Sequence, residues 1–186
     1  MKKLMMVAAL MLVSIGMYAQ NEVGQITLKP MAGVNIATIT KALEQERRVA
    51  AIAGVDGEYG LPAKFSVSAG LFYSMQGAKH YGISMKLDYI NVPILLNYYV
   101  YKGLAVKAGV QPGINVSSKI ENSSDKAGEY NTNSFYFSVP FGLSYEYLNF
   151  VLDARYSCGI STTFSPGDAK NNWVSITLGY KFALKL

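Results

Sequence analysis

The sequence predicts an all-β protein: an eight-stranded antiparallel up-and-down barrel that crosses a membrane, preceded by a signal peptide. From Ile26 to Leu184 apolar residues alternate with small or polar ones, as in Lys64–Met75, and a period of two is that of a β-strand. The second face consists mainly of Ser, Gly, Ala and Asn, which suit the inside of a narrow barrel better than a solvent-exposed surface. The apolar face must then point outward, toward lipid.

The N-terminus has the pattern of a secretory signal peptide. Lys2 and Lys3 precede the apolar run Leu4–Gly16, and a small residue, Ala19, stands before Gln20. The run is too short for a spanning helix, which needs roughly 20 residues. We therefore predict a signal peptide over residues 1–19 and one barrel domain over residues 20–186, with an uncleaved N-terminal helix as the alternative.

Eight segments carry the alternation, and each approaches or exceeds the roughly ten residues of a tilted membrane strand. They are Ile26–Ala37, Arg48–Tyr59, Lys64–Met75, Leu87–Val100, Leu104–Ser117, Ser134–Tyr145, Phe150–Ser161 and Trp173–Leu184. The shared apolar register predicts these lipid-facing residues: Val67, Leu71, Val106, Val110, Phe137, Leu143, Leu152 and Ile176. Tyrosine and phenylalanine gather near strand ends, which predicts an aromatic girdle at each membrane surface.

Short and long connections alternate along the chain. The short ones are residues 60–63, 101–103 and 146–149, and the long ones are residues 38–47, 76–86, 118–133 and 162–172. This asymmetry is typical of a bacterial outer-membrane barrel, with both termini in the periplasm and the long loops outside the cell. The polar stretch Ser118–Asn133 is the best candidate for a cell-surface loop, although all four loops could be plain solvated connections.

Some residues fit the strand pattern poorly. Pro30, Pro93, Pro112 and Pro140 fall inside predicted strands, where proline removes a ladder donor, so we expect local bulges. Asp88 falls on the lipid-facing register. It must therefore lie at head-group level, or the register must slip before Tyr89.

The inward face collects charges toward the periplasmic end. Five bases face four acids, and because an unpaired charge in a dry lumen is costly, we expect them to pair. The predicted network is Lys29, Asp56, Glu58, Lys64, Lys107, Glu146, Asp153, Arg155 and Lys181. We expect small polar residues such as Asn35, Ser74 and Ser138 to line the other half. An ion-pair plug that holds strand register is the main interpretation, and a narrow porin-like path for small solutes with slight anion preference is the alternative.

Other classes of function have less support. A lipid-modifying enzyme would need a positioned base, and His80, with Ser74 and Ser84 nearby, shows no partner by spacing, so we predict no enzyme. We expect no cofactor, metal or nucleic acid, because no such motif is present. Cys158 is the only cysteine, so no disulfide is expected. A soluble ligand-binding barrel would need its apolar face inside and a charged outside.

The chain resembles the PorT-like bacterial outer-membrane β-barrel proteins. The resemblance rests on Gly33-Val34-Asn35, Ser74-Met75-Gln76-Gly77, Tyr89-Ile90-Asn91-Val92-Pro93-Ile94-Leu95-Leu96, Ala108-Gly109-Val110-Gln111-Pro112-Gly113 and Leu178-Gly179-Tyr180-Lys181-Phe182. It implies an eight-stranded barrel, and the family's name comes from a component linked to protein secretion and gliding.

The last strand carries a second resemblance. Thr177, Gly179, Phe182 and Leu184 resemble the C-terminal signal read by the barrel-assembly machinery, although an ordinary final strand would look much the same. The expected partners are therefore outer-membrane lipid, that machinery during insertion, and an unidentified extracellular or secretion-system protein. We expect the barrel itself to be a monomer with a structural or interaction role.

Overall fold

The computed structural model describes residues 23–39, 48–80, 83–121, 135–160 and 171–184, so the predicted signal peptide lies outside the described residues. The described residues contain no helix of the length and hydrophobicity that a membrane crossing would need. The strands are β1 (Ile26–Ile39), β2 (Arg48–Gly60), β3 (Phe65–His80), β4 (Ile83–Asn91), β5 (Ile94–Tyr101), β6 (Leu104–Glu121), β7 (Phe135–Tyr147), β8 (Phe150–Gly159), β9 (Asn171–Tyr180) and β10 (Phe182–Leu184).

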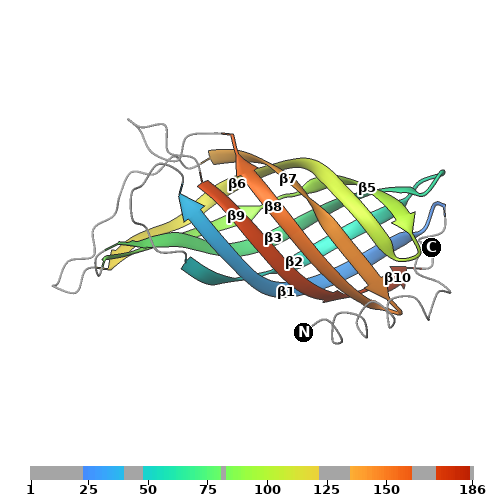
Figure 1. Ribbon diagram of the computed structural model, residues 1–186, viewed down its shortest axis with the longest axis horizontal. Helices are drawn as coiled ribbons and strands as arrows, with labels where there is room; N and C mark the ends of the chain where they lie inside the picture. The colour runs from blue at the N-terminus through green and yellow to red at the C-terminus, as the bar shows by residue number, and fades with distance from the viewer. Residues whose placement is uncertain (1–22, 40–47, 81–82, 122–134, 161–170, 185–186) are drawn as a thin grey trace, which may run out of the picture.

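These strands form one closed antiparallel barrel (Figure 1). β1 pairs with β2 on one side and with β9 and β10 on the other, which closes the sheet. β4 and β5 form one membrane strand interrupted at Val92-Pro93, because both pair with β3 and β6 in a continuous register. β9 and β10 likewise form one strand interrupted at Lys181. The predicted eight-stranded antiparallel barrel is confirmed.

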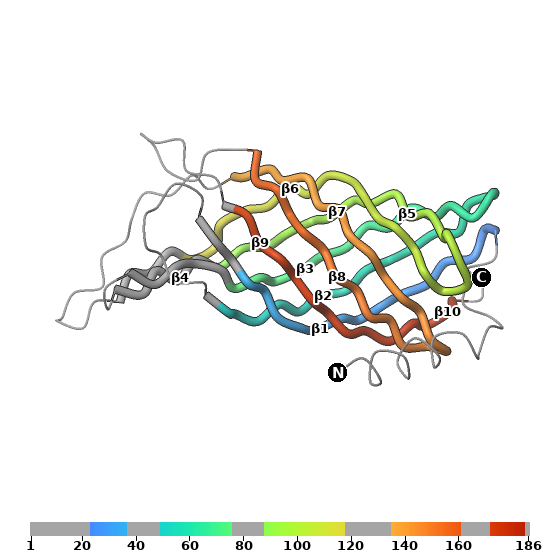
Figure 2. The backbone as a smooth tube through the Cα atoms, in the orientation of Figure 1, coloured from blue at the N-terminus to red at the C-terminus, as the bar shows by residue number. Residues whose placement is uncertain are grey.

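The stagger of the strands defines the width of the barrel. The residues paired from strand to strand, starting at Ile26, are Tyr59, Val67, Leu96, Ala108, Phe141, Tyr156, Val174 and finally Ile36. One circuit thus advances β1 by ten residues, from 26 to 36, and the strands wind obliquely round the axis in Figure 2. Eight strands with this shear tilt by roughly 40–45° and enclose a space that side chains can fill.

The period-two pattern separates an apolar outside from a polar inside. The predicted lipid-facing residues all lie on the outside of the barrel. Leu71 is 60% exposed and Leu143 51%, whereas Phe137 is only partly exposed. The inward positions are buried and mostly polar, for example Ser66, Asn97 and Ser138. The outside is therefore continuous apolar surface, as a lipid-facing barrel requires.

Three short turns lie together at one end of the barrel, which we call the turn end (Figure 1). They are residues 61–64, 102–103 and 148–149, as predicted within two residues. Ala63, Lys64 and Leu148 adopt left-handed backbone conformations there, with φ of 59°, 67° and 54°. L-residues rarely adopt this conformation, so these turns carry some backbone strain. The opposite end is the loop end.

The predicted long loop over residues 76–86 is wrong. β3 and β4 continue as a paired hairpin up to His80 and Ile83, and β6 extends beside β4 to Glu121. The predicted surface loop at Ser118 therefore begins only after Glu121. Residues 40–47, 122–134 and 161–170, which hold most of the other predicted long loops, lie outside the described residues.

The prolines interrupt the ladder without shifting its register, so the expected bulges at the prolines are wrong. Pro93 lies in the gap between β4 and β5, and the β6–β7 ladder skips the two pairs beside Pro140. Pro30 lies beside the β9–β10 break, whereas Pro112 pairs with Phe137. A register shift does occur between Asp88 and Tyr89 against β6, the slip expected as one of two outcomes.

Candidate functional site: the barrel lumen

A dense ion-pair network fills the lumen at the turn end. Lys29 Nζ donates to Glu58 Oε2 at 2.6 Å and to Glu146 Oε1 at 2.5 Å, and Lys181 Nζ donates to Glu146 Oε2 at 2.6 Å. Lys29, Glu58 and Glu146 are at most 2% exposed. Buried charges are stable only when they are paired and hydrogen-bonded, and here each carboxylate meets that condition.

Two hydroxyl groups complete this turn-end network. Tyr99 Oη donates to Glu58 Oε1 at 2.6 Å and lies 3.0 Å from Glu146 Oε1, while Ser66 Oγ donates to Glu58 Oε1 at 2.6 Å. The side chains come from β1, β2, β3, β5, β7 and the β9–β10 break, so they tie together strands from all round the barrel. The narrow lumen allows this, because side chains from opposite walls meet at its centre.

A second charged cluster lies further into the barrel. Asp153 Oδ2 accepts from Lys107 Nζ at 2.9 Å, and Asp153 Oδ1 accepts from Arg155 Nε at 2.5 Å. The guanidinium of Arg155 also lies 5.3 Å from the centre of the Phe72 ring, within cation–π range. All three charged residues are at most 6% exposed.

Asp56 departs from the predicted pairing. It is fully buried, yet neither carboxylate oxygen has a hydrogen-bond partner among the described residues, and the same holds for Arg155 Nη2. Lys107, Arg155 and Lys29 lie close enough to act on Asp56 electrostatically. Asp56 thus makes no direct ion pair with the described residues.

Lys64 was predicted in the lumen network, and that prediction is wrong. Lys64 is exposed in the first short turn, with a left-handed φ of 67°, because β3 begins one residue later than predicted. Without Lys64, the predicted network residues that lie in the lumen are four bases and four acids: Lys29, Lys107, Arg155 and Lys181 against Asp56, Glu58, Glu146 and Asp153. Their formal charges balance, so the basis for an anion preference disappears.

A small apolar cluster fills the lumen alongside the charges. It consists of Met31, Ile52, Phe72 and Val151, all buried. Glycine at neighbouring positions makes room for it: a Cβ at Gly54 or Gly70 would lie 2.6 Å from the Phe72 ring. The large inward Phe72 is thus matched by inward positions that have no side chain.

Three aromatic residues close the lumen toward the loop end, and the sequence analysis did not anticipate them. Tyr89, Tyr136 and Trp173 are at most 7% exposed, and their rings pack edge to face at centroid distances of 4.8 and 5.8 Å. Tyr136 Oη donates to Asn91 Oδ1 at 2.6 Å. The signal for them was present in the sequence, because all three residues occupy inward positions of the alternation.

Of the residues considered for catalysis, Ser74 is the one whose side chain the structure describes. Ser74 faces the lumen and its Oγ accepts from Asn35 Nδ2 at 2.6 Å. The side chains of His80 and Ser84 lie outside the described part of the chain. Among the residues that the structure describes there is no group of three or more potential metal ligands. Cys158 is free and lies on the outward side of β8.

The four residues of the predicted assembly signal divide between the two faces of the last strand. Thr177 and Gly179 point inward and are buried, whereas Phe182 is 49% and Leu184 45% exposed on the outside. The outer pair therefore presents an apolar edge at the turn end, next to β1.

Comparison with solved structures shows the fold in other proteins. One similar structure is that of Ail, the attachment invasion locus protein of Yersinia pestis, in complex with the heparin analogue sucrose octasulfate. Its sequence is 15% identical to this chain and its TM-score is 0.59. The match covers 87% of this chain and 100% of Ail. Neisserial surface protein A has 16% identity and a TM-score of 0.56, covering 84% of this chain and 97% of that protein. At such identities the likeness concerns the fold alone.

Comparison with proteins of curated function gives no match. A family model, described as the outer membrane protein beta-barrel domain, matches residues 15–165, which is most of the chain. The closed barrel, its apolar outside and its polar lumen agree with that match. The chain therefore belongs to the family of outer membrane protein β-barrel domains.

Proposed function

We propose that this outer-membrane barrel is closed to solutes and acts as a structural or interaction module through its loop end. The observation that carries the proposal is the presence of three packed side-chain clusters in the lumen. The turn-end network, the Lys107–Asp153–Arg155 cluster and the Tyr89–Tyr136–Trp173 cluster succeed one another along the axis. A path for ions would have to break several buried ion pairs, which costs several kcal/mol for each pair.

A narrow channel for small solutes is the second candidate. The observation in its favour is a set of buried polar atoms without hydrogen-bond partners among the described residues: Asp56 Oδ1 and Oδ2, Arg155 Nη2, Thr177 Oγ1, Ser144 Oγ and Ser68 Oγ. Buried polar groups usually have partners, so a group of exceptions in one lumen favours contact with water.

Conductance across a planar lipid bilayer separates the two candidates. A closed lumen predicts no steady current in wild-type protein. Replacing Arg155 with Ser should weaken the second cluster and give transient openings, because Asp153 loses one of its two cations. A stable wild-type current, carried at a defined unit conductance, would support the channel and contradict the closed lumen.

Adding bulk at Gly109 is a poor way to block such a channel. A Cβ at Gly109 would collide with the carbonyl oxygen of Ile94 on β5, so a substitution there would disturb the strand pair itself. The space beside Gly113 is already occupied, since a Cβ added there would collide with the Tyr136 ring and Asn91 Oδ1. The clearer probe is Trp173→Ala, which removes bulk from the aromatic cluster without touching an ion pair.

We further propose that the turn end and both termini face the periplasm and that the long loops face outside. The three turn-end connections are short, whereas residues 40–47, 122–134 and 161–170 are longer connections in the sequence, and this asymmetry supports the orientation. The β3–β4 connection, residues 81–82, does not follow it. Any extracellular or secretion-system partner would then bind at the loop end. A role like that of PorT-like proteins rests only on the sequence motifs that carry the resemblance.

The barrel-assembly machinery is the proposed partner during insertion. Phe182 and Leu184 support this, since they are exposed on the outside of the last strand. Phe182→Ala should slow assembly into native outer membranes, whereas Phe141→Ala, at an equally exposed outward position, should not. Equal assembly rates for the two variants would remove the support for a specific signal.

A further inference from the structure

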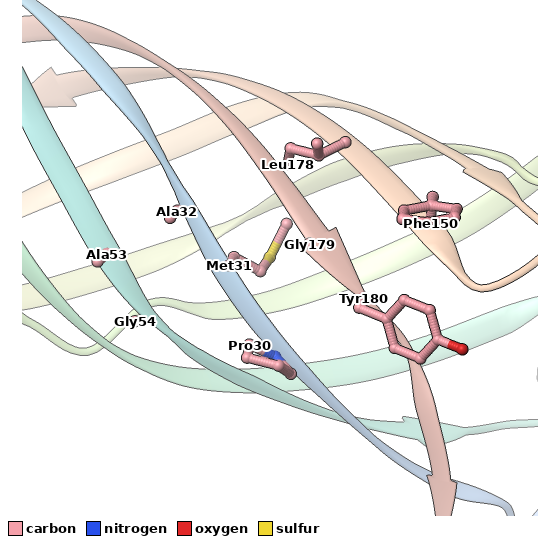
Figure 3. Close-up of a pocket in the computed structure, with 9 residues that line it drawn as sticks. All are labelled: Pro30, Met31, Ala32, Ala53, Gly54, Phe150, Leu178, Gly179 and Tyr180. Carbon is pink, nitrogen blue, oxygen red and sulfur yellow. The ribbon is translucent and has the colours of Figure 1, made fainter.

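A hollow interrupts the otherwise convex outer surface of the barrel (Figure 3). It has a volume of about 410 Å³ and lies where β1 passes between β2 and β9, with Phe150 of β8 at one end. A volume of this size falls within the roughly 300–1,000 Å³ of small-molecule sites. The hollow faces away from the lumen, so it belongs to the lipid-facing surface.

The hollow exists because several neighbouring outward side chains are small. Ala32 and Ala53 are direct cross-strand partners, and Leu178 pairs with Ala32 on the other side. Gly54 and Gly179 line the hollow with backbone only, because a side chain at either position would point inward, toward Phe72 or Met31. The surrounding outward positions carry larger groups, such as Val34 and Leu71, which are 43% and 60% exposed. These larger outward side chains border the hollow.

The strand pairing is also interrupted at this place. β9 ends at Tyr180 and β10 begins at Phe182, and Pro30 on β1 makes no ladder pair across the break. Proline has no N–H to give to a ladder. The break in the ladder therefore lies at the edge of the hollow, beside Pro30 and Tyr180.

The hollow has a polar end near the turns and an apolar end near Ala32 and Ala53. At its turn end stand Phe150 and Tyr180, whose rings pack edge to face at 5.4 Å, with Phe182 against Tyr180 at 4.8 Å. Asn149 Nδ2 donates to Tyr180 Oη at 2.9 Å in an exposed position. Aromatic residues with polar tips favour the head-group zone of a membrane. Toward Ala32 and Ala53 the lining is aliphatic.

We propose that this hollow, the β1 groove, binds one acyl chain of a phospholipid whose head group lies beside Tyr180 and Asn149. The groove is continuous with the apolar band that meets the bilayer, so a lipid chain is the molecule that reaches it directly. The groove is polar at the turn end and apolar toward the middle of the barrel. This order matches a phospholipid, with its polar head group and apolar acyl chain. The inference rests on the outer-membrane placement of the barrel and is independent of whether the lumen conducts.

Native mass spectrometry tests the site. The protein is refolded into vesicles of phosphatidylethanolamine and phosphatidylglycerol, transferred to a mild detergent, and the phospholipid that stays bound is counted. Ala53→Leu fills the groove, and Ala69→Leu is the matched control at an exposed outward position of β3. We expect one retained phospholipid for wild type and the control, and about tenfold lower retention for Ala53→Leu, the loss expected when roughly two methylene groups lose contact.

The outcomes separate failure of the site from failure of the membrane placement. Equal phospholipid retention by all three proteins would overturn the site, and so would a folded wild-type barrel that retains no phospholipid. A wild-type dimer that disappears in Ala53→Leu would assign the groove to a second copy of the chain and would also overturn the lipid site. If the wild type does not insert into vesicles at all, the outer-membrane placement itself is wrong. If Ala53→Leu fails to fold, Ala32→Leu fills the same groove from β1 and carries the same expectation.

Discussion

Glu146 is the residue whose loss should damage the barrel most. Its carboxylate accepts from Lys29 at 2.5 Å and from Lys181 at 2.6 Å, and Oε1 lies 3.0 Å from Tyr99 Oη. The residue is 2% exposed. Glu146→Ala removes all three contacts at once. Lys29 and Tyr99 keep Glu58, so the main cost is the positive charge left in excess at the turn end.

The expected loss is about 3–5 kcal/mol, the usual cost of breaking a buried ion pair from one side. That is a large share of the roughly 5–15 kcal/mol that stabilises a typical domain. Glu146→Gln keeps the volume but not the charge, so a similar loss in that variant would assign the effect to electrostatics rather than to a cavity. Lys64→Ala, at the exposed turn position, should change stability by less than about 0.5 kcal/mol.

Urea unfolding in lipid vesicles measures these losses of stability. Trp173 is the only tryptophan of the sequence and is 2% exposed, in the lumen. Its fluorescence therefore reports on the closed barrel. The double variant Glu146→Ala/Lys181→Ala should lose less than the sum of the single losses, because it removes a cation along with its carboxylate. If Glu146→Ala is as stable as Lys64→Ala, the network contributes no net stability and the reasoning fails.

Three further predictions concern other parts of the chain. Val110→Arg, on the lipid face, should cost roughly 2–4 kcal/mol in the same unfolding assay, and a neutral result would place β6 outside the hydrocarbon region. Ala63→Gly should stabilise the barrel by up to about 1 kcal/mol because it relieves a φ of 59°, whereas Ala69→Gly within β3 should destabilise it. An epitope tag near Ser124, in the segment outside the described residues, should bind antibody on intact cells; binding only after the outer membrane is opened would reverse the proposed orientation.

The alternation along the chain was sufficient to predict the strands and their two faces. Period two is a local property of a strand, so Leu71 and Val106 could be assigned outward and Asp153 and Arg155 inward without knowledge of any neighbour. The short turns followed from the same pattern. The Gln76–Lys86 hairpin did not, because this stretch lacks the alternation of apolar and small residues on which the prediction depended.

Lys64 shows how sensitive that reasoning is to strand ends. One residue of difference in where β3 begins moved Lys64 from the lumen to an exposed turn, and with it the supposed excess of positive charge. The inward aromatic residues were accessible in principle from their positions. The alternation already places Tyr89 and Tyr136 inward, but only the pairing of the strands shows that their rings meet Trp173.

The sequence by itself thus determined the class of barrel and, apart from strand ends such as Lys64, which side of the wall a strand residue faces. Only the tertiary structure decided which lumen residues meet. Lys29 and Glu146 are 117 positions apart and come from different walls, and they meet because the stagger of the strands brings them to the same height. The same stagger leaves Asp56 without a direct partner and sets Ala32 beside Ala53 on the outside. Alternation specifies a side of the wall, whereas height along the axis depends on the pairing of every strand in the circuit.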